Sequence, residues 1–371
     1  MLIQNGVVFT AGALRGQVGV RTHEGVIREI GALEPRAGED IVDAGGAYVL
    51  PGFVDIHIHG FKAHDCMDGE DAVRAMSRDL GALGVAAFVP TTMSAGREDT
   101  RAALAGIENV MHCPEPRGAA VLGAHMEAPY LNAKLKGAQV AEYLQNPSLE
   151  AYDALTEGFS CVRMMTLAPE LPGAVDLVAY LKRKGVVTCC AHSNATSAQV
   201  HAAADAGLSQ ITHLFNAQSP LHHREPGVPG AGLSDPRILV QVIADCIHLH
   251  PDILRIAALC KGACGMALIT DAMMAAGMPD GKYSLGGQDV FVVEGAARIE
   301  NGALAGSTLT MHQAIKNMIT RCHIAPESVI PMATSTPAKS VGAYEYGDIA
   351  VGKAAKFVLM DGDWNFVRAI G

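Results

Sequence analysis

The chain has 371 residues, of which 49% are hydrophobic and 18% are charged. A chain of this length and composition can bury a large core, which excludes a disulfide-stapled miniprotein and a disordered tail protein. The formal net charge is −10, and no stripe of lysine and arginine is present, so we expect no nucleic-acid partner.

The cysteines and the N-terminal residues bear on the cellular compartment. The nine cysteines include no CxxC pair, so we expect reduced thiols rather than a disulfide framework. The first residues, MLIQNGVVFT, lack the basic and apolar regions of a signal peptide. No apolar run approaches the ~18 residues of a membrane span. We therefore expect a cytoplasmic protein with no membrane partner.

Both ends of the chain are rich in short β patterns. Segments 2–10, 17–21 and 26–31 are separated by turn residues. The stretch from about residue 347 onward likewise consists of short β-rich segments separated by turn residues. Two such ends that flank one long middle indicate that the termini meet. We predict a small discontinuous β-sandwich domain built from residues 1–50 and 345–371.

The middle of the chain alternates apolar runs with helical patterns, which mark segments such as 70–83 and 174–184. Fully apolar strands that alternate with helices indicate a parallel sheet covered on both faces. We predict an α/β fold, a (β/α)8 TIM barrel over residues 51–344, with an antiparallel hairpin insertion at 283–299. The eight runs are 48–58, 85–90, 119–125, 161–167, 186–191, 210–215, 238–247 and 263–269.

Polar residues gather at the C-terminal ends of these runs, where barrels of this kind place their catalytic groups. The first run ends in His57 and His59, which share one face because residues two apart on a strand point the same way. A single histidine at a strand end is usually structural. Imidazoles combined with carboxylates, however, suit Zn²⁺ or Fe²⁺ with a position left open for water. The predicted metal site comprises His57, His59, Glu127, His192, His213 and Asp271.

The segments around these residues carry a specific resemblance. They include PGFVDIHIHG, HMEAPYLN, AHSNAT, THLFNAQSP and LITDAM, and they run from residue 51 to about residue 311. On these segments the chain resembles the amidohydrolase superfamily and, within it, the N-acetylglucosamine-6-phosphate deacetylase family. The resemblance covers essentially the whole chain. It implies a metal-dependent hydrolase that releases acetate from a small amino-sugar phosphate in amino-sugar metabolism.

The resemblance implies a role for each metal-site residue. Glu127, His192 and His213 match the ligands that all forms of the family keep. His57 and His59 match a pair that some forms retain and others replace. We therefore expect one or two divalent ions per chain, with Glu127 bridging the two when both are present.

The resemblance also implies the catalytic and substrate-binding residues. Asp271 matches the catalytic carboxylate, which accepts the proton of the attacking water and delivers it to the leaving amine. Arg224 and His248 are expected to reach across a homodimer to the sugar phosphate. The full set of predicted substrate-binding positions is Asn216, Ala217, Arg224, His248, Gln139, Leu304, Ala305 and Gly306.

Two residues depart from the family pattern. Ala128 stands where a glycine commonly follows the ligand glutamate, so a positive φ there would be strained. Gln139 stands where many members have a histidine that helps to hold the substrate carbonyl. An amide donates a hydrogen bond but cannot become protonated as an imidazole can. We therefore expect Gln139 to change how the substrate carbonyl is polarised, and not which reaction is catalysed.

Three alternative functions differ from this interpretation. N-acetylgalactosamine 6-phosphate or another N-acyl amino-sugar phosphate is an alternative substrate, since epimers differ by one hydroxyl. A barrel that binds a sugar phosphate without turnover is disfavoured by Asp271 and the complete set of ligands. A cyclic-amide hydrolase would typically carry a lysine at the end of the fourth strand, where this chain has Thr166 to Pro169.

Overall fold

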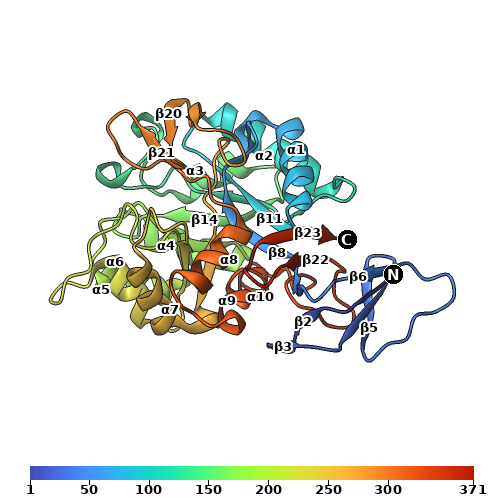
Figure 1. The fold of residues 1–371 in the computed structure, drawn as a ribbon. Coiled ribbons are helices and arrows are strands. Elements are labelled where there is room, and N and C mark those ends of the chain that lie inside the picture. Colours follow the sequence, from blue (N-terminus) through green and yellow to red (C-terminus); the bar gives the residue numbers. More distant parts are fainter.

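The computed structural model describes residues 1–371 and is built around an eight-stranded parallel barrel (Figure 1). The strands follow one another in chain order around the barrel, each hydrogen-bonded to the next. This confirms the predicted TIM barrel. The strands are β8 (Phe53–Ile58), β11 (Val85–Thr92), β13 (Ala124–Met126), β14 (Val162–Leu167), β15 (Val187–Cys190), β16 (Gln210–Ile211), β17 (Leu239–Ile243) and β18 (Met266–Ile269). The two-residue strand β12 (Ala120–Val121) also pairs with β11.

The barrel closes between its first and last strands through the residues that follow β18. The Asp271 N–H donates to the carbonyl of His57 at 2.9 Å, and the His59 N–H donates to the carbonyl of Ala272 at 2.9 Å. The same contacts therefore complete the barrel and fix the predicted histidine pair against the predicted catalytic carboxylate.

Helices surround the barrel and bury apolar residues against it, and α4 shows how an apolar face does so. Its buried residues Ala174, Leu177, Val178 and Leu181 recur at helical spacing, and the helix ends at Gly185, whose φ of 76° glycine adopts without strain. The helices are α1 (Glu70–Ala82), α2 (Arg97–His112), α3 (Leu149–Thr156), α4 (Ala174–Lys184), α5 (Ser197–Ala206), α6 (Gly227–Ser234), α7 (Pro251–Gly265), α8 (Met311–Thr320), α9 (Pro326–Met332) and α10 (Ser335–Ser340). None is long and apolar enough to cross a membrane.

Several apolar runs are longer than the strands they contain. The first run divides at Gly52 into β7 (Tyr48–Pro51), which joins another sheet, and β8 of the barrel. The sixth run is a strand only to Ile211, because His213 and Phe215 have φ values of 33° and 75°, which no strand accommodates. Hydrophobicity thus continues past the strand end, into turns that carry the candidate site residues.

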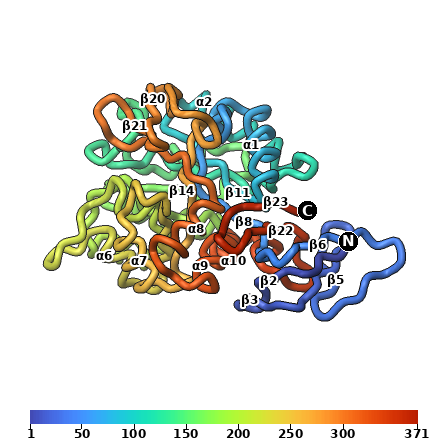
Figure 2. Tube along the Cα trace, viewed as in Figure 1, coloured from blue at the N-terminus to red at the C-terminus, as the bar shows by residue number.

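The two ends of the chain form two sheets that pack around a shared core, on the side of the barrel where both termini lie (Figure 2). One sheet has the order β5 (Val26–Gly31), β4 (Gly19–His23), β1 (Leu2–Gln4), β6 (Ile41–Asp43). The other has the order β23 (Phe366–Ile370), β22 (Phe357–Met360), β7, β2 (Val7–Thr10), β3 (Ala13–Arg15). The pairing of β22 with β7 joins the C-terminal segment to the N-terminal one. The exact domain boundaries remain a prediction.

A third small sheet extends the predicted hairpin insertion. It contains three antiparallel strands rather than two: β19 (Gly281–Leu285), β20 (Gln288–Val293) and β21 (Ala296–Ile299). Its buried face packs on Met93 and Met273 from the barrel loops, and the Gln288 amide donates to the carbonyl of Ala138. A further pair, β9 (Gly60–Phe61) and β10 (His64–Asp65), follows the first barrel strand.

Candidate metal centre and substrate pocket

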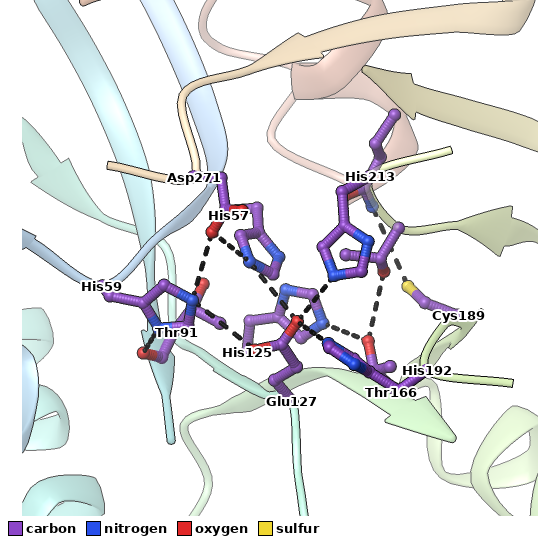
Figure 3. Close-up of polar contacts among 12 residues, drawn as sticks. His57, His59, Thr91, His125, Glu127, Thr166, Cys189, His192, His213 and Asp271 are labelled. Atoms are coloured by element: carbon purple, nitrogen blue, oxygen red, sulfur yellow. Dashed lines mark hydrogen bonds and ion pairs between the residues drawn. The ribbon is translucent and has the colours of Figure 1, made fainter. Parts of the chain in front are cut away.

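Six side chains from five barrel strands converge at the C-terminal mouth of the barrel (Figure 3). Each stands in, or just after, the strand that the sequence assigned to it, and all six residues are buried. Their ligand atoms form two groups, and within each group these atoms lie within 4.8 Å of one another. The groups are Glu127, His192 and His213, and His57, His59 and Asp271.

The first group is organised by the carboxylate of Glu127. Its Oε1 lies 3.0 Å from Nε2 of His213 and 3.4 Å from Nε2 of His192. On the other side of the ring, His192 Nδ1 is 2.8 Å from the carbonyl of Leu135. A carbonyl accepts only from an N–H, so this contact places the proton on Nδ1 and leaves Nε2 free to bind a metal ion.

The second group is organised by Asp271, whose Oδ1 lies 3.2 Å from Nε2 of both His57 and His59. His59 Nδ1 is 2.9 Å from the carbonyl of Thr91, which orients that ring as Leu135 orients His192. Glu127 faces this group as well, with Oε2 3.5 Å from His59 Nε2 and Oε1 3.7 Å from His57 Nε2. Glu127 therefore stands between the two groups.

The electrostatics of the cluster are dominated by buried carboxylates. Burial alone would raise the pKa of Glu127, but the neighbouring imidazole of His57 and the contacts with His192 and His213 hold it well below its usual range. Burial also opposes ionisation of Asp271, and His57 and His59 outweigh it and lower its pKa. Conversely, Asp271 and Glu127 overcome the effect of burial on His59 and raise its pKa to about 9.

These features fit a divalent metal ion. Both carboxylates are buried, and their ion-pair contacts are with histidines, without a lysine or arginine to balance them. Both ring nitrogens of His57 and the Nδ1 of His213 are buried without a hydrogen-bond partner. Buried charges are normally paired or bound to metal, and buried polar atoms are rarely left unpaired. The donor set of imidazoles and carboxylates is one that Zn²⁺ and Fe²⁺ accept.

The backbone is strained at three of the six candidate ligands. His192, His213 and Asp271 have φ values of 46°, 33° and 49°, in the left-handed region that residues other than glycine seldom adopt. Such strain persists where the surrounding structure imposes it, and it gathers at functional sites.

Two buried residues beneath the cluster were not among the predicted site residues. The Asp55 carboxylate accepts from the Thr270 hydroxyl at 2.5 Å and from the backbone N–H groups of Thr270 and His57, each at 3.3 Å. It thereby ties β8 to the segment that carries Asp271. His125 pairs through Nε2 with the Thr166 hydroxyl at 2.7 Å, and its ring lies edge-on to His57. The DxHxH spacing and the HME segment could have signalled both.

A pocket of about 420 Å³ opens beside the cluster and is lined by most of the predicted substrate residues. His248 lines the pocket of its own chain, whereas the resemblance implied a reach across a dimer; Asp245 holds its ring, with Oδ2 2.7 Å from Nδ1. Lys134, Met93 and Leu285 also line the pocket and were not predicted. The predicted residues that line it are Asn216, Ala217, His248, Gln139, Leu304, Ala305 and Gly306.

Arg224 does not lie in this pocket. It sits on an exposed loop before α6, where its Nη1 is 2.7 Å from Nε2 of His223. Within one chain, the Arg224 guanidinium therefore lies apart from the other predicted substrate-binding residues.

The two departures from the family pattern have clear structural settings. Ala128 is buried and is not among the residues with positive φ, so the expected strain is absent. Gln139 donates from Nε2 to Glu127 Oε2 at 2.6 Å and accepts from the Ser94 N–H at 2.7 Å. Its amide is thus committed to the carboxylate that stands between the two groups of ligands.

Comparison with known proteins gives a consistent result. Residues 48–369 match the model of the amidohydrolase family. N-acetylglucosamine-6-phosphate deacetylase from Vibrio furnissii is 39% identical over 93% of this chain and 86% of its own length. N-acetylgalactosamine-6-phosphate deacetylase from Escherichia coli O157:H7 is 36% identical over 92% of this chain and 90% of its own length.

Solved structures agree with the sequence comparison. A mutant of N-acetyl-D-glucosamine-6-phosphate deacetylase from Mycobacterium smegmatis, in complex with N-acetyl-D-glucosamine-6-phosphate, superposes with a TM-score of 0.92 at 32% identity. That match covers 100% of this chain and 97% of the other. The N-acetylglucosamine-6-phosphate deacetylase of Pasteurella multocida gives a TM-score of 0.94 at 26% identity, with the same coverage.

Proposed function

Because the chain belongs to the amidohydrolase family, among the N-acetylglucosamine-6-phosphate deacetylases, we propose that it hydrolyses the acetamide of N-acetylglucosamine 6-phosphate to glucosamine 6-phosphate and acetate. One observation carries the proposal. Two buried carboxylates and four imidazoles converge at the barrel mouth, beside a pocket large enough for a sugar phosphate. We assign the reaction to the barrel domain of residues 51–344, with 1–50 and 345–371 as a separate small domain.

The ligand set supports one or two divalent ions, Zn²⁺ or Fe²⁺. Glu127, His192 and His213 would hold the first, and His57, His59 and Asp271 the second. Such an ion lowers the pKa of water from ~15.7 to about 7 and polarises a carbonyl oxygen. The carbonyls of Leu135 and Thr91 fix two of the imidazoles in advance, so the protein orients its ligands without a ligand-induced rearrangement.

Asp271 is the group that moves the proton. Its carboxylate is buried and kept ionised by His57 and His59, so an oxygen is free to accept the proton of the water that attacks the acetamide carbon. The same carboxyl then donates that proton to the amine nitrogen. An amine leaves readily only when it is protonated, so this second transfer completes the cleavage of the C–N bond.

The sugar phosphate would lie on the side of the pocket formed by the loops after β16 and β17. Asn216, Ala217 and His248 line that side, and Lys134 brings an exposed ammonium group to the same pocket without an ion pair of its own. Arg224 would complete the phosphate site from a second copy of the chain, since within its own chain it is exposed and lies outside the pocket. We therefore propose a homodimer.

The test is acetate release by the purified, metal-loaded protein. We expect turnover of N-acetylglucosamine 6-phosphate that stops on chelation, returns with added Zn²⁺ or Fe²⁺, and is poor with unphosphorylated N-acetylglucosamine. N-acetylgalactosamine 6-phosphate belongs in the same assay because a relative named for that substrate is 36% identical. Faster turnover of that epimer would replace the proposed sugar. Tight binding of both without acetate release would instead identify a binding protein.

The phosphate contact has its own test in Arg224→Ala. Each charged hydrogen bond is worth ~1.5–3 kcal/mol, so kcat/KM for the phosphorylated sugar should fall by about 10- to 150-fold. The residual activity on the unphosphorylated sugar should hardly change. Equal losses with both substrates would show that Arg224 has a structural role. Sedimentation of the same samples would report whether the variant remains dimeric.

A further inference from the structure

Met93 lies between the catalytic pocket and a second cavity, where it can limit the length of the acyl group that the pocket accepts. It follows β11 and is 3% exposed. It is the only residue that lines both the catalytic pocket and a neighbouring cavity of about 380 Å³. Resting on the proposed deacetylase function, we propose that Met93 limits the N-acyl group of the substrate to acetyl, and that the cavity behind it is a latent site for longer acyl chains.

The position of Met93 places it against the reacting groups. Its Sδ lies 3.6 Å from Nε2 of Gln139, and that same nitrogen is 2.6 Å from Oε2 of Glu127. On its far side, its Cε lies 3.0 Å from where a Cβ on Gly286 would stand, in the turn between β19 and β20. The thioether is thus held between the ligand shell and the small sheet.

The direction of the acyl group follows from the barrel and from amide geometry. The predicted sugar-phosphate contacts Asn216, Ala217 and His248 come after β16 and β17, the sixth and seventh strands. Met93 comes after β11, the second strand, which stands opposite the sixth in an eight-stranded barrel. A planar trans amide places the sugar and the acyl chain on opposite sides of the C–N bond. With the carbonyl at the ligands, the acyl methyl therefore points toward Met93.

The second cavity has a mixed lining with an apolar part that can take a short aliphatic tail. It lies between the loop after β11, the start of α2, and α3. Ala128, Pro129, Leu144 and Leu155 supply the apolar part, and polar residues such as Arg97 and Glu142 complete the lining. The rest of the partition is rigid, because the Ser94 N–H donates to Gln139 Oε1 at 2.7 Å and the Ser94 hydroxyl accepts from the Val140 N–H at 2.6 Å. The unbranched Met93 side chain is thus the removable part of the wall.

The experiment compares N-acetyl, N-propionyl, N-butyryl and N-hexanoyl glucosamine 6-phosphate with the metal-loaded protein and with Met93→Ala. In the parent, kcat/KM should fall by about 10-fold or more for an added methylene that the pocket cannot take. In Met93→Ala the butyryl-to-acetyl ratio of kcat/KM should rise by at least about 10-fold. Met93→Val, which removes less volume, should give an intermediate ratio and serves if the alanine variant does not fold.

Two control variants test whether the joining of the two cavities causes the change in acyl preference. Met273 is fully buried in the same apolar cluster as Met93 but lines neither cavity, so Met273→Ala should leave the acyl-length ratio unchanged whatever it does to the rate. Ala154 lines the second cavity and not the catalytic pocket, so adding Ala154→Phe to Met93→Ala should refill that space and restore the preference for acetyl.

The outcomes separate the two proposals. A parent protein that releases no acetate from N-acetylglucosamine 6-phosphate would overturn the proposed function itself. An active parent whose acyl-length ratio does not change in a folded Met93→Ala or Met93→Val variant would overturn only the role of Met93. The same increase in Met273→Ala would show that loosened packing, rather than the joined cavities, admits the longer chains.

Discussion

Two regions of the molecule bury charge, and they do so in opposite ways. In the β domain formed by the two ends of the chain, Arg21 is 5% exposed, and every nitrogen of its guanidinium donates a hydrogen bond. Its Nε donates to Glu39 Oε1 at 2.8 Å, its Nη1 to Glu29 Oε2 at 2.7 Å, and its Nη2 to the carbonyl of Glu34 at 2.7 Å. Arg36 adds a second guanidinium on Glu29 at 2.7 Å. Each hydrogen-bonding partner in this network comes from the protein itself, and the two guanidiniums balance the two carboxylates.

The barrel mouth has the opposite balance. The ion-pair partners of Glu127 and Asp271 are all imidazoles, and the one other side chain that donates to Glu127 is the neutral amide of Gln139. The ring of His57 has no hydrogen-bond partner on either nitrogen. A self-satisfied network stabilises a fold and needs no further component, whereas a cluster with unbalanced anions and unpaired donors is completed by a ligand. The contrast distinguishes a structural ion network from a functional site, although both are buried and rich in charge.

The largest expected effect comes from Asp271, the carboxylate that we propose moves the proton. Asp271→Asn keeps the shape of the side chain but cannot accept or deliver a proton at the mouth. We expect turnover to fall by about 10²- to 10⁴-fold, with far-UV circular dichroism unchanged. Retention of the parent rate by this variant would rule out Asp271 as the general acid–base group.

The two groups of ligands can be separated by a double change. His57→Gln with His59→Asn leaves Glu127, His192 and His213 in place, so we expect the variant to keep one ion where the parent binds two. Some turnover should remain, more than in Asp271→Asn. Elemental analysis after dialysis measures the metal content of the parent and of the variant. Equal metal content in the two proteins would contradict the assignment of a second ion. Loss of all metal in the variant would show that His57 and His59 belong to the primary site.

In the Arg21 network we expect a loss of stability without a change in chemistry. Arg21→Met removes the guanidinium and leaves Glu29 and Glu39 facing each other, so the midpoint of urea unfolding at pH 7 should fall. Metal content and kcat/KM of the folded variant should match those of the parent. A change in either would show that the small sheet domain communicates with the barrel mouth.

The pH dependence of that loss has a definite sign. The hydrogen bond from Arg21 holds the pKa of Glu39 below its usual value, and Arg36 and Arg21 together lower the pKa of Glu29 despite burial. A carboxyl whose pKa is depressed by folding stabilises the fold above its unfolded pKa of about 4.3, and that stability is lost as the pH falls through the folded value. The difference between parent and variant should therefore be full at pH 7 and shrink below about pH 4.

The smallest effect is expected where charges pair in solvent. Lys282 and Asp289 lie 2.7 Å apart on the small sheet over the mouth, with side chains that are 59% and 60% exposed. Asp289→Asn should change the free energy of unfolding by no more than about 0.5 kcal/mol. A larger loss would mean that solvent exposure does not explain the contrast between the buried networks and surface pairs.

Several site residues were predictable because strand ends are visible in sequence. Fully apolar runs locate the barrel strands, and a parallel barrel brings their C-terminal ends to one mouth. His57, Glu127 and Asp271 could therefore be grouped before any distance was known. The pattern failed at strand limits, as in the run that ends at Ile211, because hydrophobicity reports burial and the turn carrying His213 is as buried as the strand.

The amino-acid sequence by itself determined the barrel, the meeting of the two ends, and the identity of the six convergent side chains, because each follows from local periodicity and residue chemistry. Tertiary structure alone decided how those side chains are held. Asp55 is fixed by Thr270, 215 positions away, and Gln139 turns its amide onto Glu127. Arg224 lies outside its own pocket, and Met93 divides two cavities. Such contacts depend on the packing of segments distant in sequence, and no local pattern records their distances or directions.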